Sequence, residues 1–576
     1  MERRLLIVFA LTFLVIILSQ PLIKKYFPQT QTPSTAPAPL KPENTPAAPV
    51  PQTAAAAPSV VRTEGALRAA GSIKQAASEQ ETVVENDVYK ITFTNQGGRV
   101  KSWVLKDYTD NHGQKLDLVN TAAAAKYGYP LSLWAWDEGL RNKINTVLYE
   151  PSKTGNQTAP TDLTFEYSDQ DVSIRKTFHF DKSYVLSLES SVIQKGTVVS
   201  ALPMWPAGIG DQLSAASYSS SQIEHQNNGD TERLAIKKIS GGGTVAGPFN
   251  WAAVADQYFS AVFIPDDPAG STLVTLRNPL DIPKDPKKPN PQETTRVDVL
   301  GAAVGNLKGP TIERLYVGPK SLQVLESVPV PTVTGAAQDL RSLVNFGFFS
   351  VIARPLFLWL KWTHEHIIRN WGWAIVLQTL IINLVLLPLR ITSMKSMLKM
   401  QRIQPQIKAI QEKYKKYSMR DPRKQEMNKE IMDLQRQAGV SPLGGCLPML
   451  IQLPFLFAYY GMLGSALDLR HASWLWISDL SSPDPYYLIP IGIVVSMFIM
   501  QRMTPQTGMD PAQQKMMTLM MPMMLGIMSF NLPSGLGLYW SEGNLIGIVQ
   551  QSIMNRTSLG REMREIAAKR ARKKEK

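Results

Sequence analysis

Polar side chains interrupt several apolar stretches in the C-terminal part of this 576-residue chain. Thr379 and Asn383 are four positions apart and so share one face of a helix, with Gln378 beside them. Gln452 and Tyr459 share a face of a second stretch. Each such group costs free energy in hydrocarbon unless it faces protein or water. The pattern therefore predicts helices whose polar faces converge on a wet groove.

Two side chains that ordinarily carry a charge at neutral pH, Arg390 and Glu542, accompany these residues. Arg390 follows Asn383 by seven positions, which is two helical turns, and Tyr539 and Glu542 share a face of a third apolar stretch. An isolated carboxylate is costly to bury, so we expect Glu542 to be protonated or paired. Ordinary hydrogen bonding between packed helices is the alternative role for the uncharged residues.

Membrane-spanning helices are the elements that must position these side chains. The chain has six apolar stretches of near-spanning length, the first directly after Met1–Arg4. That first stretch has no Ala-x-Ala-like cleavage site, which favours an uncleaved anchor over a signal peptide. A Pro/Ala-rich segment then follows, and its composition predicts a tether without a core of its own.

Short runs with a period of two fill the middle of the chain. Residues 88–93 and 100–105 alternate around a turn at Asn95–Gly98, which is typical of a β-hairpin. The same period returns at 172–180, 184–188 and 258–264. We therefore predict a two-sheet β-sandwich, and we find no paired catalytic residues in it.

The basic residues predict the orientation in the membrane. Residues 390–439 and 556–576 carry net charges of +8 and +6, which together equal the net charge of the chain, +14. The positive-inside rule places both segments, and both termini, in the cytoplasm and the sandwich outside. Membrane topology thus explains the excess of basic residues, which argues against a dedicated nucleic-acid-binding protein.

The segment 390–440 has its own helical pattern. Apolar residues recur at helical spacing as far as Tyr414. Asp421 and Pro422 then suit the start of a second helix, and Gly439 suits its end. These features predict a cytoplasmic helical hairpin, acting either as a topology determinant or as a docking arm for a ribosome or targeting receptor.

Other composition signals narrow the function. Twenty-one of the 23 methionines lie at or after residue 394, which suits either a surface for varied apolar partners or generic bundle packing. His364-Glu365-His366 lacks the spacing of a zinc motif, and a single Cys excludes an intramolecular disulfide framework. We expect no metal, no cofactor and no enzymatic activity.

These signals divide the chain as follows. We expect residues 1–23 to form a transmembrane anchor, 24–80 a linker, 81–340 a β-sandwich on the outer side of the membrane, 341–368 an interfacial amphipathic helix, 371–389 transmembrane helix 2, 390–440 the cytoplasmic hairpin, 443–463 transmembrane helix 3, 464–485 a loop on the outer side, 486–501 transmembrane helix 4, 516–531 transmembrane helix 5, 535–553 transmembrane helix 6, and 554–576 a basic cytoplasmic tail.

Several motifs in the C-terminal part occur together and in a specific order. They are Asn370-Trp371-Gly372-Trp373-Ala374-Ile375, Pro388-Leu389, Ser441-Pro442-Leu443-Gly444-Gly445-Cys446-Leu447-Pro448, Gln452-Leu453-Pro454, Asp484-Pro485-Tyr486-Tyr487-Leu488-Ile489-Pro490, Pro533-Ser534-Gly535-Leu536, Leu538-Tyr539-Trp540 and Asn544-Leu545. This set resembles the YidC family of bacterial membrane protein insertases. The anchor, linker and sandwich resemble its Gram-negative form.

The resemblance implies an inner-membrane α-helical bundle of six transmembrane helices, five of them a family core around a hydrophilic groove closed toward the periplasm. A nascent membrane protein would place its polar flank in the groove while its apolar segment slides along spans three and five into lipid. Thr379 would line the groove, and Tyr539 and Trp540 would face the substrate. The implied partners are ribosomes, a targeting receptor, the Sec translocon and the phospholipid membrane.

Two departures from the family pattern stand out. The family usually has an arginine in span two where this chain has Asn383, so we expect Arg390 to supply any positive field, and Glu542 falls where apolar residues are expected. A solute transporter or channel is the alternative function, although no inverted repeat of broken spans is evident. An envelope enzyme that acts on sugars through the sandwich is a third.

Overall fold

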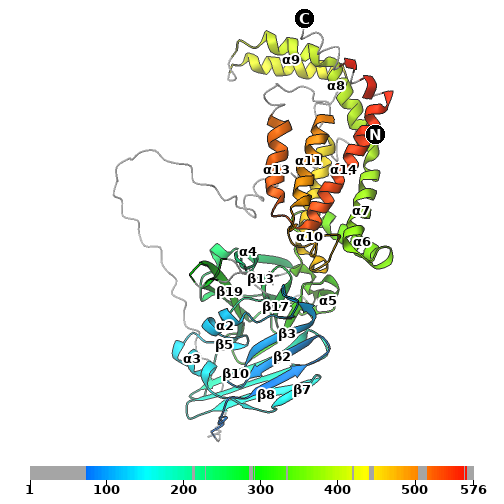
Figure 1. Ribbon diagram of the computed structural model, residues 1–576. Coiled ribbons are helices and arrows are strands. Elements are labelled where there is room, and N and C mark those ends of the chain that lie inside the picture. The colour runs from blue at the N-terminus through cyan, green and yellow to red at the C-terminus, as the bar shows by residue number, and fades with distance from the viewer. Residues whose placement is uncertain are drawn as a thin grey trace. The chain divides into compact units, whose positions relative to one another are not determined.

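The computed structural model describes residues 73–566 apart from 211–213, 228, 285–289, 291, 333–334, 336, 418–420, 440–446, 504–515, 559 and 563–564. The predicted anchor, most of the predicted linker and the end of the basic tail therefore lie outside the described residues. Figure 1 shows strands through the blue-to-green part of the chain and mainly helices from there to the C-terminal end.

The strands of the described residues form three large sheets, with almost all neighbours antiparallel. The first has the order β4 (Lys115–Asp117), β3 (Arg99–Thr109), β2 (Tyr89–Thr94), β1 (Glu81–Glu85) and β7 (Gly155–Thr158). The second has the order β14 (Asp230–Leu234), β13 (Gln222–Asn227), β16 (Trp251–Ala255), β17 (Phe259–Pro265), β20 (Thr311–Pro319), β10 (Val185–Gln194), β9 (Val172–Phe180), β8 (Thr161–Ser168) and β6 (Glu150–Pro151), and β11 (Thr197–Val199) pairs with β10. The third has the order β15 (Gly243–Ala246), β18 (Ser271–Pro283), β19 (Thr294–Asn306), β12 (Leu202–Trp205) and β5 (Ser132–Trp134).

Short elements complete this β region. They are α2 (Thr121–Tyr127), α3 (Glu138–Thr146), α4 (Ala215–Ser219), α5 (Leu322–Glu326) and the strand pair β21 (Pro329–Val330) and β22 (Gln338–Asp339). The hairpin expected around Asn95–Gly98 is confirmed, because β2 and β3 pair antiparallel across it. Gly97 has φ of +66° there, and a Cβ would lie 2.6 Å from the Asn145 carbonyl oxygen, so glycine is required.

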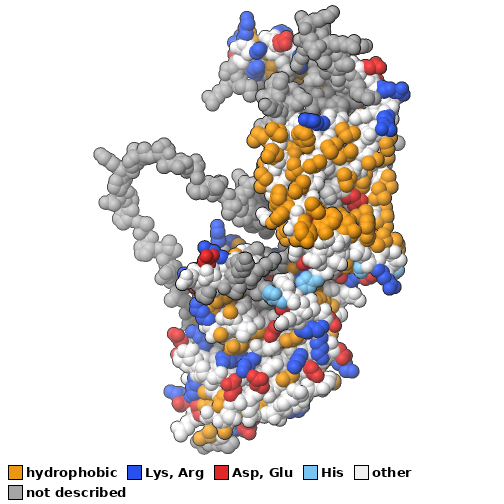
Figure 2. Space-filling model, in the orientation of Figure 1, with side chains coloured by type: hydrophobic (Ala, Val, Ile, Leu, Met, Phe, Trp, Pro, Cys, Tyr) orange, Lys and Arg blue, Asp and Glu red, His pale blue; other side chains and the backbone are white. Residues whose placement is uncertain are grey.

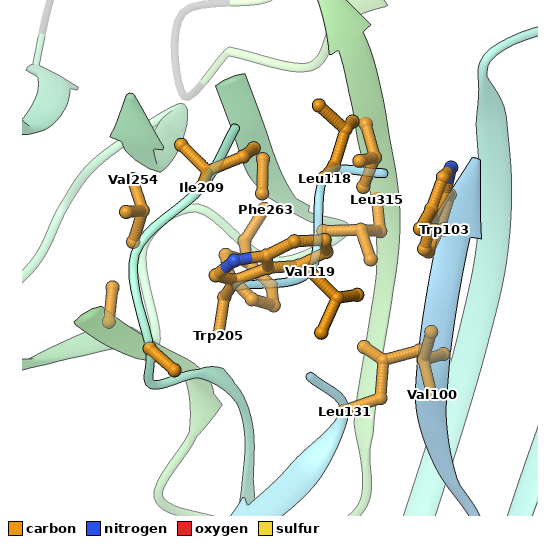
Figure 3. Close-up of a cluster of buried hydrophobic side chains, with 14 of the residues drawn as sticks. Val100, Trp103, Leu118, Val119, Leu131, Trp205, Ile209, Val254, Phe263 and Leu315 are labelled. Carbon is orange, nitrogen blue, oxygen red and sulfur yellow. The ribbon is translucent and has the colours of Figure 1, made fainter. Parts of the chain in front are cut away.

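The core of the β region lies between its sheets. Along β9, buried and more exposed residues alternate, as expected for a strand with one face on a core. Trp103 of β3 and Trp205 of β12 meet there with ring centroids 5.9 Å apart, and Phe263 and Leu315 join them from the second sheet (Figure 3). This packing confirms the predicted β-sandwich. The prediction of two sheets was wrong, because the described strands form three large ones.

The C-terminal region is helical. Its helices are α6 (Ser350–His366), α7 (Trp371–Val385), α8 (Leu387–Lys413), α9 (Arg423–Gln437), α10 (Leu447–Ser465), α11 (Leu488–Met503), α13 (Met521–Ser529), which follows a π-helical turn at Met516–Met520, and α14 (Ser534–Arg556). Helix α14 packs against α7, α10 and α11, and a buried cluster that includes Tyr459, Ile375 and Leu538 joins them.

Helix boundaries here follow from local chemistry. The Asn370 side chain caps α7 by accepting from the Trp373 amide. Pro388 is favourable in the first turn of α8 but would disrupt a single helix that continued from α7 into α8. Within the described residues, no single helix combines the length and apolarity needed to cross a membrane, although α7 and α8 together, bent by 48°, have both.

Helices α8 and α9 form an antiparallel pair. Lys413 near the end of α8 pairs with Glu430 of α9 (3.1 Å), and Gln435 of α9 lies against the Met400 sulfur (3.9 Å). The two contacts run in opposite directions along the two helices, which is the arrangement of a hairpin.

Candidate functional site

A cavity of about 400 Å³ lies between α8, α10, α11 and α14. One part of its wall is polar, with Arg390, Ser393, Gln452, Tyr539, Trp540, Asn544, Gln550 and Gln551. Another part carries the flexible side chains of Met394, Met397, Met500 and Met554. The cavity can therefore hold a polar segment beside an adaptable apolar one.

The residues singled out from the sequence fall into two groups. Arg390, Gln452, Tyr539 and Trp540 line the cavity. The others lie outside its lining: Gln378, Thr379, Asn383 and Tyr459 are buried in the helix packing, and Glu542 is partly exposed.

A chain of polar contacts connects the two groups. The Tyr459 hydroxyl donates to Gln378 Oε1 (2.6 Å), and Gln378 Nε2 donates to the Leu356 carbonyl of α6 (2.9 Å). The Tyr459 ring stacks on Tyr539 with centroids 3.9 Å apart, and Gln452 Nε2 donates to the Tyr539 hydroxyl (3.3 Å). The path runs from α6 through α7, α10 and α14 to the cavity wall.

Thr379 and Asn383 satisfy their donors within their own helix. Thr379 Oγ1 donates to the Ile375 carbonyl (2.7 Å), and Asn383 Nδ2 donates to the Thr379 carbonyl (2.9 Å). Such bonds to the preceding turn need no water and no second helix. They leave Asn383 Oδ1 as an acceptor for a neighbour.

Arg390 is that neighbour. Its Nη2 donates to Asn383 Oδ1 (3.1 Å), and its Nη1 donates to Gln550 Oε1 of α14 (2.6 Å). Gln550 Nε2 in turn donates to the Asn383 carbonyl (3.3 Å). The guanidinium is thus held at the cavity wall by amides from α7 and α14.

Glu542 has a different environment. It lies on α14, half-buried, and its Oε2 is buried without a hydrogen-bond partner among the described residues. The pairing that we considered from the sequence is therefore not present at this oxygen in the described part of the chain.

Sequence reasoning missed Gln550, Asn544 and the cavity methionines as site residues. Asn544 Nδ2 donates to Ser496 Oγ of α11 (3.1 Å) and so links two helices at the wall. Residues 539, 543, 547, 550 and 554 recur at steps of three or four, which puts them on one face of α14. That spacing from Tyr539 is the signal that could have identified Gln550.

The histidines near α6 are engaged with aromatic rings. His364 stacks on Trp371 with ring centroids 4.0 Å apart, and His366 stacks on Trp362. Within the described ranges, no group of three His, Cys, Asp or Glu side chains is placed to hold a metal ion.

The outer surface of the helical region is apolar. Figure 2 shows hydrophobic side chains covering much of the face around α11, α13 and α14, whereas Lys, Arg, Asp and Glu are scattered over the β region. Exposed examples include Ile491, Val495, Ile527, Val549 and Ile553. Such a large apolar surface marks contact with lipid or with other apolar partners.

The fold and the site together define a class: a helical membrane protein with a large β-sandwich domain and a part-polar cavity between its helices. Comparison with known proteins gives the family. Residues 362–561 match the model of the 60Kd inner membrane protein family, and residues 81–359 match that of the YidC periplasmic domain.

Whole relatives agree with the family models. The chain is 32% identical to the membrane protein insertase YidC of Ralstonia nicotianae over 94% of both chains. It is also 32% identical to that of Geobacter sp. strain M21, over 84% of this chain and 86% of the other. A crystal structure of an active YidC insertase with its first transmembrane domain resolved covers 84% of this chain and 94% of its own, with 18% identity and a TM-score of 0.33.

The chain belongs to the YidC family of membrane protein insertases. By family it is an inner-membrane protein with a periplasmic domain, and that domain is the β-sandwich described above.

Proposed function

We propose that this protein inserts nascent membrane proteins into the inner membrane and assists their folding. The observation that carries the proposal is the cavity between α8, α10, α11 and α14, whose wall combines a cation and amides with four methionines. A membrane protein entering the bilayer must bring a polar flank and an apolar segment together. This wall offers both kinds of contact.

The polar flank of the substrate enters the cavity, where it exchanges water for Arg390, Gln452 and the other polar groups. Its apolar segment moves along the outer faces of α10 and α13. Those faces expose Phe457, Tyr460, Met523, Met524 and Met528. Flexible thioethers accept segments of different shape, so one surface serves many clients. No nucleotide is needed, because burial of the apolar segment in lipid drives the movement.

The proposed topology has six transmembrane helices with both termini in the cytoplasm. Its support is the net charge of +8 and +6 on residues 390–439 and 556–576. Helix α6 lies in the membrane interface, which its exposed Val351, Leu358 and Trp362 suit.

The hairpin of α8 and α9 is the proposed docking arm for a ribosome or a targeting receptor. Helix α9 has no fully buried residue, so the face that does not pack against α8 is available to a partner. Its basic residues also suit the anionic phospholipid surface. We also propose that the protein works together with the Sec translocon.

A crosslinking and insertion assay tests the proposed function. A photoreactive phenylalanine analogue replaces Trp540 in protein reconstituted in liposomes, and ribosomes then supply a single-span nascent chain. We expect both a crosslink and a protease-protected fragment. The matched control places the analogue at Trp136 in the sandwich. Insertion equal to that of empty liposomes would contradict the proposal.

A further inference from the structure

The chain turns back on itself directly after α14. The helix ends at Arg556, and Thr557 takes an extended conformation, with φ of −70° and ψ of 167°. The Thr557 hydroxyl donates to the Met554 carbonyl (2.6 Å) and accepts from the Gly560 amide (3.4 Å). Thr557 thus closes α14 and also caps the helical turn that follows it. The reversal is encoded within a few residues.

Gly560 makes this turn possible. A Cβ at position 560 would lie 2.5 Å from the Met554 carbonyl oxygen and 2.5 Å from the Asn555 Cα, and both of these atoms are backbone. Any other residue would therefore force the turn open. We call the described residues that begin at this glycine, namely 560–562, 565 and 566, the strap.

The strap runs along α8. Arg402 Nε donates to Glu562 Oε1 (3.0 Å), and Arg402 Nη2 donates to the same oxygen. Ile566 packs against a cluster formed by the buried Met394 and Leu398. As the strap advances from Glu562 to Ile566, its partners on α8 move back from Arg402 toward Met394. The strap is therefore antiparallel to α8, and its turns are the red ones beside that helix in Figure 1.

The strap supports the methionine side of the cavity wall. Met397 and Met554 pack against the same cluster as Ile566, and Met394, Met397 and Met554 all line the cavity. Ile566 is not part of that lining, so the strap lies behind the wall and not inside the cavity. Because the strap continues from α14, its contacts with α8 join two helices that bound the cavity.

These contacts are weak enough to be reversible. The Arg402 and Glu562 side chains are 56% and 40% exposed, and ion pairs between exposed side chains contribute little stability. Ile566 is only half-buried and so adds a modest apolar contact. The strap can therefore leave α8 without unfolding the helices.

We propose that the strap is a latch that joins α8 to α14 and keeps the methionine side of the cavity closed, and that a client enters the cavity only after the strap has left α8. This inference rests on the proposed insertase function and adds a control step to it. A strap that merely finishes the fold of α14 would have no effect on entry, whether bound or released.

A reversible crosslink tests the latch. Arg402→Cys and Glu562→Cys are combined in a Cys446→Ser protein, which has no other cysteine. A bismaleimide with a reducible disulfide joins the two positions in the full-length protein, which is then reconstituted in liposomes. A small single-span protein is added without ribosomes, so that the proposed docking role of the hairpin does not enter, and the protease-protected product is measured. We expect the crosslinked protein to insert at no more than about one tenth of the uncrosslinked rate, and reduction to restore insertion, since only released molecules are competent.

The matched control crosslinks another exposed ion pair that joins separate elements. Lys143 of α3 and Asp169 lie 2.6 Å apart in the sandwich, and the same crosslink between Lys143→Cys and Asp169→Cys should leave insertion unchanged. An unchanged rate in the crosslinked strap, or an equal loss in this control, would overturn the inference with the insertase function intact. Failure of the uncrosslinked protein to insert would instead contradict the function itself.

Variants that weaken the latch should have the opposite effect. Arg402→Glu replaces attraction by repulsion, so insertion should become about two- to fivefold faster, the range that an exposed ion pair allows. Adding Glu562→Arg restores the pair and should return the rate to that of the wild type. Gly560→Ala opens the turn and should also raise the rate. A faster rate that Glu562→Arg does not reverse would contradict the latch.

Discussion

The β-sandwich and the helical region use buried polar groups in opposite ways. In the sandwich, Lys176 is fully buried, and its Nζ donates to three carbonyls, those of Gly97 (2.7 Å), Gly98 (3.2 Å) and Leu131 (2.8 Å). Every donor of that ammonium is used by the protein. In the helical region, the Arg390 guanidinium donates to two amide oxygens, which are neutral and do not balance its charge.

The outer surfaces differ in the same sense. The sandwich exposes charged side chains, whereas the helices expose apolar ones (Figure 2). Apolar side chains fill the core of the sandwich, and polar contacts accompany the apolar packing between the helices. Water drives the first arrangement, but lipid is as apolar as a leucine side chain and drives no such sorting. Polar contacts and close packing therefore define the inside of the helical region. Four substitutions test this comparison.

The largest expected effect comes from Lys176→Met in the sandwich. Three buried carbonyls lose their donor, so the free energy of unfolding should fall by about 3–5 kcal/mol. Hydrogen exchange of the β9 amides in the full-length protein at increasing urea measures this. Lys182→Met, at an exposed position on the next turn, should change the value by less than about 0.5 kcal/mol. Equal effects of the two substitutions would mean that the buried contacts contribute nothing.

The next effect concerns close packing of the helices. A Cβ on Gly461 of α10 would lie 2.2 Å from the Phe346 carbonyl oxygen, which is backbone and cannot swing away. Gly461→Ala should therefore lower stability by about 1–3 kcal/mol, measured by titration with a denaturing detergent. Gly464→Ala on the same helix has open space around its Cβ and is the control. If both variants behave alike, backbone propensity rather than packing decides.

A pH-dependent effect is expected in the sandwich. Glu313 of β20 is buried, and neither of its carboxylate oxygens has a hydrogen-bond partner in the described part of the chain. Burial, and to a lesser extent the charge of Asp266, raises the pKa of Glu313 well above its ordinary value. The folded state thus keeps a proton that the unfolded chain releases at lower pH. Stability should fall as the pH rises from the ordinary carboxyl pKa through the folded one, by up to about 1.4 kcal/mol per pH unit.

Glu313→Gln should remove this slope, because the amide does not titrate. Unfolding of the sandwich in urea at several pH values measures it. Glu189→Gln, at an exposed position on the neighbouring strand β10, should leave the slope in place. A slope that persists in Glu313→Gln would assign the pH dependence to another group.

The smallest expected effect is that of Tyr459→Phe in the helical region. The substitution removes the donor to Gln378 Oε1 but keeps the ring stacked on Tyr539, so the loss should be about 1 kcal/mol. Retention of the folded form in a denaturing detergent measures it. Tyr460→Phe, exposed on the same helix, is the control and should have no effect.

The sequence predicted which residues share one face of a strand or helix better than it predicted which residues they contact. The alternation along 172–180 places Lys176 on the apolar face of its strand, but the turn and loop carbonyls that receive its donors come from 45 to 79 positions away. In the same way, the spacing of Asn383 and Arg390 indicated a shared face, while Gln550 lies 160 positions from Arg390. Contacts between distant segments depend on which elements pack together, and the local pattern of a single sequence does not encode that.

The place of Arg390 in its helix has a mechanical consequence. Arg390 is the fourth residue of α8, and α8 continues to Lys413, where it forms one arm of the hairpin. A tilt of that arm about the bend between α7 and α8 would hardly displace Arg390, because Arg390 lies close to the bend. A rotation of α8 about its own axis by 20° moves the end of a side chain by about 2 Å, which is enough to break hydrogen bonds of this length. A twist of the hairpin about the axis of α8, rather than a tilt, would therefore break the hydrogen bonds from Arg390 to Asn383 and Gln550.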